Sequence, residues 1–392
     1  MSDIHGFDPS DYQFDERPAD EVTELPEPRP QHRVAVIRTS DRILFKKCRR
    51  RWGWNSHLRG NLGPKTNAAP LWFGSGFHFA LEDFHGAGIY GSPVKAFEAY
   101  VIATRRKSKY SLPGDWAEHL ELGRGMLSYY EEWLVGRQKL DTYVYRGKPQ
   151  VEVNFRVSIP GDWTAYGYDE VVYSGTLDRV VIDEWGQLWI LEYKTAKIVQ
   201  TMHLGHDDQV SSYCWVGAHL YDKPIAGVIY QQHRKALPED PRILASGKLS
   251  TNKQMLTTHR HYRASLINLY GSVQSAPGYA VEFLNYLSGI EAFEGDKFIR
   301  RDKAERNAHQ CEAQGEKIVM EIHEMLNPEL PLYPNPTRDC FYMCPFLGAC
   351  VSLDDGSDWE QELEALMVPR EAEYDSWRQF LPAPEELGAP AV

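Results

Sequence analysis

The sequence contains no apolar run that approaches the roughly 20 residues needed to cross a bilayer. It holds no Gly-x-x-x-x-Gly-Lys-Ser/Thr motif, the loop with which nucleotide-driven motors bind phosphates, and no internal repeat stands out. No secretory signal is recognised, and only six of the 392 residues are cysteine. We therefore expect a soluble, intracellular (cytoplasmic) protein with no membrane partner and no motor of its own.

Acidic residues outnumber basic ones, and the excess lies at the two ends of the chain. The formal net charge is −12, yet residues 1–30 carry −7 and residues 351–392 carry −9, which leaves +4 for residues 31–350. Both ends are also rich in proline, a composition that disfavours a packed core. We expect an acidic disordered tail at 1–30, one compact domain at 31–350, and an acidic, partly disordered tail at 351–392. Such tails confer solubility or compete electrostatically for a basic cleft.

Periodicity predicts an α/β domain with its strands in the middle of the sequence. Residues 151–159 are apolar at every second position, and two apolar segments, 171–183 and 187–193, flank a turn. They predict a strand followed by a hairpin, with 225–231 as a fourth strand, in a core at about 150–235. A helical part is expected at about 60–145, and a helical, cysteine-rich part at about 260–350. The predicted helices outside the core are 93–109, 115–137, 265–287 and 304–326.

Two acids and a lysine lie on the predicted hairpin. Asp178 is on the first strand, and Glu192 and Lys194 are two residues apart on the second, so their side chains share one face. Carboxylates are the ligands that Mg²⁺ and Mn²⁺ prefer. A neighbouring ammonium orients an attacking water and stabilises charge on a phosphate, while the metal lowers the pKa of water. These residue types therefore predict phosphodiester hydrolysis. The alternative is a hairpin on which the same three side chains are simply exposed to solvent and have no catalytic role.

Polar residues at helical spacing lie on both sides of this hairpin. Upstream, Gly74 precedes His78 by four residues in a predicted helix; downstream, Gln209 and Tyr213 are also four residues apart. A helical histidine is often structural, and a Gln and Tyr at this spacing arise by chance. Their order around the acids makes the combination specific.

Three of the six cysteines form a closely spaced set. Cys340, Cys344 and Cys350 lie together near the end of the predicted domain, and Cys48 lies near its start. Four thiolates bind a 4Fe-4S cluster or a tetrahedral zinc ion, and unrelated thiols are the third reading. The two other cysteines, Cys214 and Cys311, are expected to be ordinary core or surface residues.

A basic run surrounds Cys48 and is interleaved with tryptophan. Cations that follow a backbone and indole rings that stack on bases suit single-stranded nucleic acid. A solvated helix face with core tryptophans has the same composition. The candidate DNA-binding residues are Lys46, Lys47, Arg49, Arg50, Arg51 and Trp52.

Taken in order, these motifs resemble the PD-(D/E)XK nuclease superfamily, and within it the RecB-like nucleases that carry an iron-sulfur cluster. The chain is most similar in pattern to the CRISPR-associated RecB-like exonucleases, and more distantly to the AddB nuclease domain. The cysteine spacing, and Arg49 at the usual proline position, depart from the family pattern.

The resemblance implies a restriction-endonuclease-like fold, a central mixed sheet flanked by helices, with a helical N-terminal part and a C-terminal iron-sulfur segment. It implies that His78, Asp178, Glu192 and the backbone carbonyl of Tyr193 bind Mg²⁺ or Mn²⁺. Lys194 then positions water, while Gln209 and Tyr213 orient that lysine or the scissile strand. Cys48 joins Cys340, Cys344 and Cys350 around a 4Fe-4S cluster.

The implied function is a metal-dependent DNA exonuclease that prefers single-stranded or end-bearing DNA, in recombination, repair, replication or CRISPR-like processing. A helicase or a recombination or CRISPR protein is the implied partner. Two alternatives remain: a non-catalytic DNA-binding or partner-binding subunit with the same fold, and a duplex endonuclease.

Overall fold

The computed structural model describes residues 32–65, 69–106, 115–135, 137, 140–291, 295–370 and 381–387. The predicted acidic tail at 1–30 lies outside these residues. No helix in the described ranges has both the length and the apolar character needed to cross a membrane.

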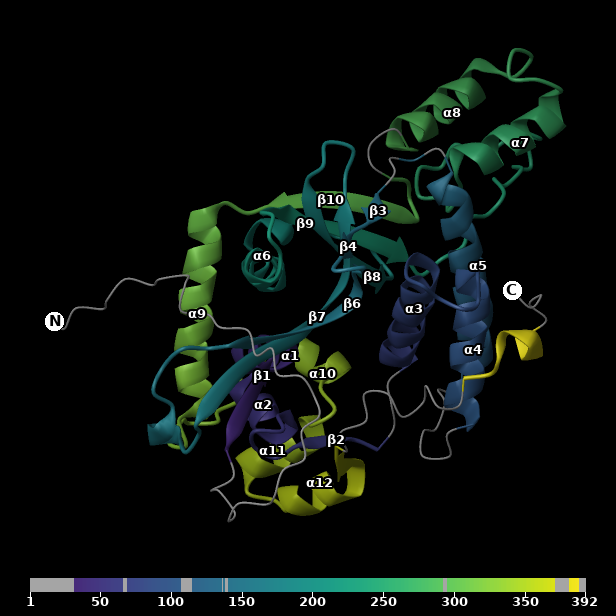
Figure 1. Ribbon diagram of the computed structural model, residues 1–392. Coiled ribbons are helices and arrows are strands. Elements are labelled where there is room, and N and C mark those ends of the chain that lie inside the picture. Colours follow the sequence, from purple (N-terminus) through teal and green to yellow (C-terminus); the bar gives the residue numbers. More distant parts are fainter. Residues whose placement is uncertain are drawn as a thin grey trace.

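A seven-stranded mixed sheet forms the centre of the molecule (Figure 1). Its main path runs β1 (Val34–Arg38), β7 (Glu170–Ile182), β8 (Leu188–Ala196), β9 (Ile225–Arg234), β10 (Ile299–Glu305). β3 (Asp141–Thr142) and β6 (Val151–Ser158) also pair with β7. The strands predicted at 151–159, 171–183, 187–193 and 225–231 are confirmed as β6, β7, β8 and β9.

The long strand β7 has different neighbours along its length. β1 pairs in parallel with its first five residues, whereas β8 pairs antiparallel with its last four, from Arg179 onward. Asp178 comes directly before that second pairing. It therefore stands where β1 and β8 diverge, next to the strand that carries Glu192 and Lys194.

Helices cover both faces of the sheet, which gives three layers (Figure 1). On one face α6 (Asp208–Leu220) and α9 (Ala308–Leu326) bury Ile190 and Val228 of the sheet; on the other, α3 (Ala69–His85), α4 (Pro93–Arg106) and α5 (Trp116–Leu134) bury Trp189 and Leu191. The period of two along β8 sends neighbouring residues into opposite cores. The sheet and its flanking helices agree with the predicted α/β class.

Two strands on the main path of the central sheet escaped prediction, and one predicted helix is divided. β1 and β10 were not expected, and 304–326 begins as the end of β10 before α9 starts at Ala308. The expected helix at 265–287 consists of α7 (His259–Tyr270) and α8 (Gly278–Glu291), separated by a turn that begins at Gly271 with φ of +82°. Five of the seven residues of β10 are charged, so its sequence resembles an exposed helix face more than a strand of the central sheet.

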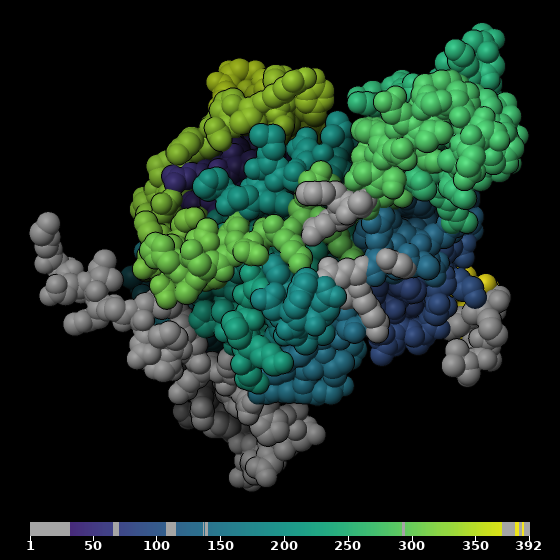
Figure 2. All heavy atoms as spheres, turned by 90° about the horizontal axis from the view of Figure 1, so that it is seen from above, coloured from purple at the N-terminus to yellow at the C-terminus, as the bar shows by residue number. Residues whose placement is uncertain are grey.

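The segment between β9 and β10, residues 235–298, contains α7 and α8 and is called the arm below. It has a separate apolar cluster built around Tyr262, Leu266 and Phe283. The arm stands out from the body of the molecule in both overall views (Figures 1 and 2).

The two ends of the described chain form a second small assembly. α1 (Thr39–Lys47), α2 (Arg49–Asn55) and β2 (Leu62–Pro64) lie beside α10 (Asp339–Met343), α11 (Leu347–Asp355), α12 (Trp359–Leu366) and β11 (Met367–Pro369). β11 pairs with β2, and Leu363 and Met367 are buried against Trp54. Folded structure continues past the predicted boundary at residue 350, through α11, α12 and β11 to residue 370. A short hairpin of β4 (Val144–Tyr145) and β5 (Lys148–Pro149) completes the strands.

Candidate active site

Three elements bring polar side chains to the divergence of β1 and β8. His78 comes from α3, Asp178 from β7, and Glu192 and Lys194 from β8, as the sequence predicted. Gly175 on β7 is required there, since an added Cβ would lie 2.6 Å from both the Phe155 ring and the Thr39 hydroxyl. That close contact lets α1 approach the sheet three residues before Asp178.

Asp178 is buried, with 7% of its surface exposed, and both carboxylate oxygens are engaged. One accepts a hydrogen bond from the Tyr193 backbone N–H at 2.7 Å, and the other lies 3.3 Å from His78 Nδ1. Burial alone would raise the pKa of Asp178, but the nearby charges of His78 and Lys194 and the Tyr193 N–H hold it below its ordinary value. Asp178 is thus kept as a carboxylate.

His78 faces two carboxylates rather than one. Its Nδ1 lies 3.3 Å from Asp178 and 3.6 Å from Glu152, a residue of β6. Burial would lower the pKa of His78, yet the attraction of Asp178 and the contacts with both acids raise it well above 6.5. A cation is therefore favoured at this point between the two acids, and the imidazole fills that role in the absence of another one.

Glu152 is the site residue that the sequence interpretation missed. Val151 and Val153 pair with Arg179 and Leu177, so Glu152 stands opposite Asp178. Its φ of +46° is rare for a residue with a side chain and costs about 1–2 kcal/mol. Strand periodicity could have shown that this acid lies on the face away from Val151 and Val153, but it gave no sign of the backbone distortion.

The ligand atoms of His78, Glu152 and Asp178 all lie within 4.8 Å of one another. Within the described residues this is the group of acids and histidines that is compact enough to hold a divalent ion. Two carboxylates and an imidazole match the donors that Mn²⁺ and Mg²⁺ accept.

Glu192 and Lys194 are bonded to each other beside this group. Glu192 is 2% exposed; one of its oxygens accepts from the Lys194 ammonium, and the other is buried without a hydrogen-bond partner. Burial and the charge of Asp178 raise the pKa of Glu192 to about 7, against the opposing effect of Lys194. An unpartnered buried oxygen costs about 1–3 kcal/mol, and a bound cation would satisfy it.

Gln209 and Tyr213 are brought to the same region by α6. Gln209 donates a hydrogen bond to the Tyr213 hydroxyl at 2.8 Å, and Tyr213 is buried. Burial, followed by the charges of Glu192 and Asp178, raises the pKa of Tyr213 well above 10. Tyr213 is thus near both acids, while an orienting role toward Lys194 stays a prediction, as does metal binding by the Tyr193 carbonyl.

The face of β8 opposite the candidate site is also polar, which the sequence did not suggest. Tyr193 projects there and accepts a hydrogen bond from Arg179 at 3.3 Å, and its ring lies parallel to that of His85. His85 contacts the Tyr130 hydroxyl at 2.8 Å. Burial, then Arg179 and Arg301, lowers the pKa of His85, so this histidine is a neutral core residue that supports the strand from behind.

A scan against protein-family models matches residues 41–351 to the PD-(D/E)XK nuclease superfamily. The chain belongs to this superfamily. Comparison with curated proteins gives no match. Members of this superfamily are typically metal-dependent nucleases that act on DNA, and the candidate acidic metal site described above agrees with that chemistry.

The four predicted cluster cysteines line one small cavity of this PD-(D/E)XK protein. Each sulfur has an N–H donor close by: Arg51 N for Cys48 at 3.5 Å, Thr337 N for Cys340 at 3.4 Å, Phe346 N for Cys344, and the Arg50 guanidinium for Cys350 at 3.3 Å. Hydrogen bonds to sulfur stabilise thiolates that bind metals. Among the residues described, no three of these sulfur atoms lie within 4.8 Å of one another.

The two remaining thiols are separate from this cavity. Cys214 is buried in the core under α6, and Cys311 packs against the same core. Burial raises the pKa of both, which makes them unreactive. This agrees with the expectation that they are ordinary residues.

The predicted DNA-binding run requires a correction, beginning with Trp52. Its side chain is 0% exposed and packs edge-on against Phe45, so it has no face on which a base could stack. The indole is a core residue because α2 folds against α1. The alternative interpretation, a core tryptophan, is the right one.

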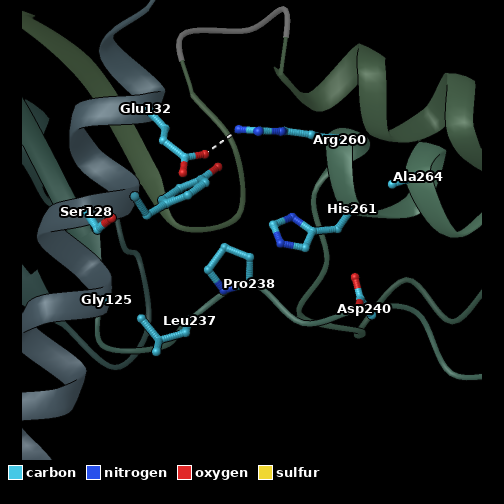
Figure 3. A pocket seen from close by; sticks show the side chains of 10 residues that line it. Gly125, Ser128, Glu132, Leu237, Pro238, Asp240, Arg260, His261 and Ala264 are labelled. Carbon is cyan, nitrogen blue, oxygen red and sulfur yellow. Dashed lines mark hydrogen bonds and ion pairs between the residues drawn. The ribbon is translucent and has the colours of Figure 1, made fainter.

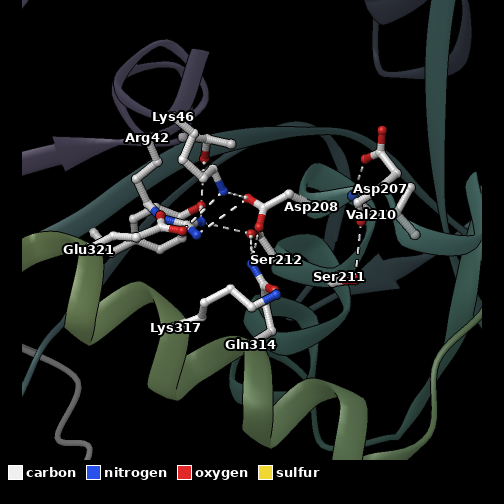
Figure 4. A network of polar contacts seen from close by, with 12 residues as sticks. Arg42, Lys46, Asp207, Asp208, Val210, Ser211, Ser212, Gln314, Lys317 and Glu321 are labelled. Carbon is white, nitrogen blue, oxygen red and sulfur yellow. Dashed lines mark hydrogen bonds and ion pairs between the residues drawn. The ribbon is translucent and has the colours of Figure 1, made fainter. Parts of the chain in front are cut away.

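The basic residues of that run are mostly neutralised within the protein. Arg42, from the same segment, is fully buried and contacts Glu321 at 2.7 Å and Ser212 at 2.9 Å, while Lys46 pairs with Asp208 at 2.6 Å (Figure 4). Among the others, Lys47 pairs with Asp339, Arg49 with Glu324, and Arg50 with Asp354. These contacts join α1 and α2 to α6, α9, α10 and α11, so most of the run fastens the two ends of the fold together.

Proposed function

We propose that the protein is a metal-dependent DNA exonuclease with a structural 4Fe-4S cluster. The observation that carries the proposal is the convergence of His78, Glu152 and Asp178, with the Lys194–Glu192 pair beside them. If the only role of Glu192 were to neutralise Lys194, two further acids, Glu152 and Asp178, would not be needed so close to that pair. The arrangement is the one expected for divalent-metal hydrolysis of a phosphodiester.

Asp178, Glu152 and His78 would hold the divalent ion, and the free oxygen of Glu192 lies ready as a further ligand. When bound, Mg²⁺ or Mn²⁺ supplies Lewis-acid polarisation of the phosphoryl oxygen and acidifies water. Lys194, held in place by Glu192, orients a water and stabilises negative charge that develops on phosphate. Gln209 and Tyr213 form one side of the site and position Lys194 or the strand to be cut.

Two carboxylates that share one histidine support metal binding rather than a purely structural ion pair. A structural pair would be satisfied by Asp178 and His78, and it would not explain the distorted backbone of Glu152. Strained residues of this kind persist where the surroundings enforce them, and they cluster at functional sites.

The cysteine cavity supports the cluster part of the proposal. Four thiols from distant segments, each with an N–H donor, fit the ligands of a 4Fe-4S cluster, and zinc is the chemical alternative. Such clusters accompany RecB-like exonucleases in the family that the sequence resembles. The preference for ends or single strands, and a helicase, recombination or CRISPR partner, are proposed on the same resemblance.

The test is a nuclease assay with Mn²⁺ on linear and circular DNA, single- and double-stranded. We expect cleavage of linear DNA, and a loss of about 100-fold or more in Asp178→Ala and Lys194→Ala. Lys223→Ala is the matched control, because Lys223 is exposed two residues before β9, at the opposite end of the strands from Lys194.

Full activity in either site variant would refute the site assignment. Cleavage of circular duplexes would show an endonuclease instead. Absence of cleavage with retained DNA binding would show a non-catalytic binding subunit.

A further inference from the structure

Most basic residues of the run at 46–51 are paired with acids of the protein itself, so another surface must hold DNA near the candidate site. The arm has such a surface. Between Arg234 and Tyr270 the chain has seven Arg or Lys residues and two acids, in a protein whose formal net charge is −12. Four of these cations are exposed and form no ion pair with any described residue: Arg242, Lys248, Lys253 and Arg263. We propose that the arm is a DNA-binding element that holds the phosphate backbone beyond the catalytic strand.

The arm is connected directly to the candidate site through β9. Lys194 on β8 is paired with Gln232 on β9, and Arg234 follows two residues later, roughly 7 Å further along the strand. The next residue, Lys235, donates its backbone N–H to Ala196 at 2.8 Å. A phosphate strand that leaves Lys194 along these strands therefore meets the base of the arm.

Positive charge is continuous across that junction. Lys197 and Lys235 directly follow the last paired residues of β8 and β9, Ala196 and Arg234, and the Lys235 ammonium lies over the Phe73 ring. Burial and the nearby charge of Lys197 lower the pKa of Lys235. Neither forms an ion pair with another described residue. Two adjacent cations without acids repel each other, and a bound phosphate relieves that repulsion.

The exposed cations of the arm are held on a firm support. Lys248 lies over the ring of Tyr279 and Lys253 over that of Tyr286, at 5.7 and 4.8 Å from the ring centroids. Both rings belong to the apolar cluster between α7 and α8. Cation–π contacts keep the lysine stems on this surface and leave the ammonium groups in solvent.

A loop at the edge of the arm adds apolar contact to this charge. Backbone hydrogen bonds from Leu244 to Lys248 and from Ser250 to Arg242 close the loop. Its tip exposes Ile243 and Leu244 between two cations. Apolar side chains framed by Arg and Lys suit the sugar and base edges of DNA, as well as its phosphates.

Phe298 of the arm is buried in the core of the body, but another part of the junction between arm and body is a cavity. A cavity of about 380 Å³ lies between α5, the 237–240 loop and α7, and Arg260 reaches across it to Glu132 (Figure 3). Arg260 is thus the arm cation that is already paired with the body, and it is left out of the proposed contact set.

The experiment measures DNA binding without cleavage, because this inference rests on the proposed nuclease function. All proteins carry Lys194→Ala and receive no added divalent metal. Affinity for a fluorescent single strand and for a blunt duplex is measured by anisotropy over a range of salt concentrations. The test variant adds Arg242→Ala, Lys248→Ala, Lys253→Ala and Arg263→Ala, and the matched control adds Lys148→Ala and Lys223→Ala, exposed lysines near the opposite end of the strands.

We expect the arm variant to bind at least about tenfold more weakly, with the slope of log K against log salt reduced by about 3 on the strand it contacts. The control should keep the parental slope. Equal affinity and slope in the arm variant on both probes would overturn the proposal. The nuclease assay described above distinguishes failure of the proposed function from failure of the arm proposal. If the wild-type protein does not cleave DNA, the proposed nuclease function is refuted, and the anisotropy experiment still tests DNA binding by the arm.

Discussion

Glu152 links the strained backbone of β6 to the metal site. A left-handed φ is unfavourable for glutamate, and its carboxylate is aimed at His78, beside Asp178. Burial and the charge of Asp178 raise the pKa of Glu152, against the opposing contact with His78. The left-handed backbone of Glu152 and the burial of its carboxylate beside Asp178 are each unfavourable on their own. A bound divalent cation would compensate for the two neighbouring negative charges.

Glu152→Gln is therefore expected to weaken Mn²⁺ binding by about tenfold or more while preserving the fold, because the amide keeps the shape and loses the charge. Isothermal titration with Mn²⁺ measures the affinity, and thermal unfolding checks the fold. Glu312→Gln, an exposed acid on α9, is the control. Unchanged Mn²⁺ affinity would remove Glu152 from the ligand set.

At the scale of elements, the most consequential contact joins α1 to α6 and α9. The Arg42 guanidinium is fully buried, donates to Glu321 and Ser212, and lies 3.3 Å from Asp208 without hydrogen-bond geometry. α6 also carries Gln209 and Tyr213, so this network determines how that helix sits against the candidate site (Figure 4).

Arg42→Ala should lower the free energy of unfolding by about 3–5 kcal/mol, because it leaves Glu321 buried without its main partner. Arg42→Lys should recover only part of this, since one ammonium cannot reach partners on three elements. Urea unfolding of the three proteins measures the difference. A loss below about 1 kcal/mol in Arg42→Ala would mean that Lys46 alone neutralises the acids.

The same elements show what the sequence could predict. The strands that carry Asp178, Glu192 and Lys194 are apolar runs on either side of a turn, so the hairpin follows from local pattern. The two-residue spacing of Glu192 and Lys194 then places these two side chains on one face. Arg42 and Trp52 belong to a segment whose composition suits a DNA surface, and only contacts with α6 and α9, more than 150 residues away in sequence, show that it is interior. Glu152 was missed because a single φ angle redirects its side chain.

The C-terminal elements provide another test at this scale. Trp54 of α2 packs between Phe346 and Trp359, with ring centroids at 5.6 and 6.1 Å, and Arg370 donates to the Asn55 carbonyl at 2.6 Å. Phe346 also lines the cysteine cavity. Removing α12 and β11 would thus expose one wall of that cavity.

A chain that ends at Asp355 should be less stable than one that ends at Arg370 by at least about 3 kcal/mol, because Leu363 and Met367 lose their buried positions. Denaturant unfolding and metal content compare the two. The chain that ends at Arg370 also controls for loss of the segment beyond it. Equal stability and equal metal content would show that α12 and β11 are dispensable.

For the whole molecule, the cysteine cavity joins segments from the two ends of the fold. A link from Cys48 to Cys340 closes a loop of almost the entire domain, and the chain entropy it removes from the unfolded state is roughly 5–6 kcal/mol as an upper bound. The ion pairs from α1 and α2 to α10 and α11 act across the same junction. A group bound by these thiolates would therefore stabilise the whole domain and not only its surroundings.

The Cys48→Ser variant tests whether Cys48 stabilises the whole domain through a bound group or only the start of α2 through its cap. Cys48 also caps α2 by accepting from the Arg51 N–H, and serine is an equally good cap, so the helix itself should survive the change. We expect anaerobically purified wild-type protein to be brown with a broad thiolate-to-iron absorption band, and Cys48→Ser to lose both iron and thermal stability. Cys311→Ser, a thiol outside the cavity, should lose neither. Full iron content in Cys48→Ser would exclude it as a ligand, whereas a colourless wild type with one equivalent of zinc would replace the cluster by a zinc site.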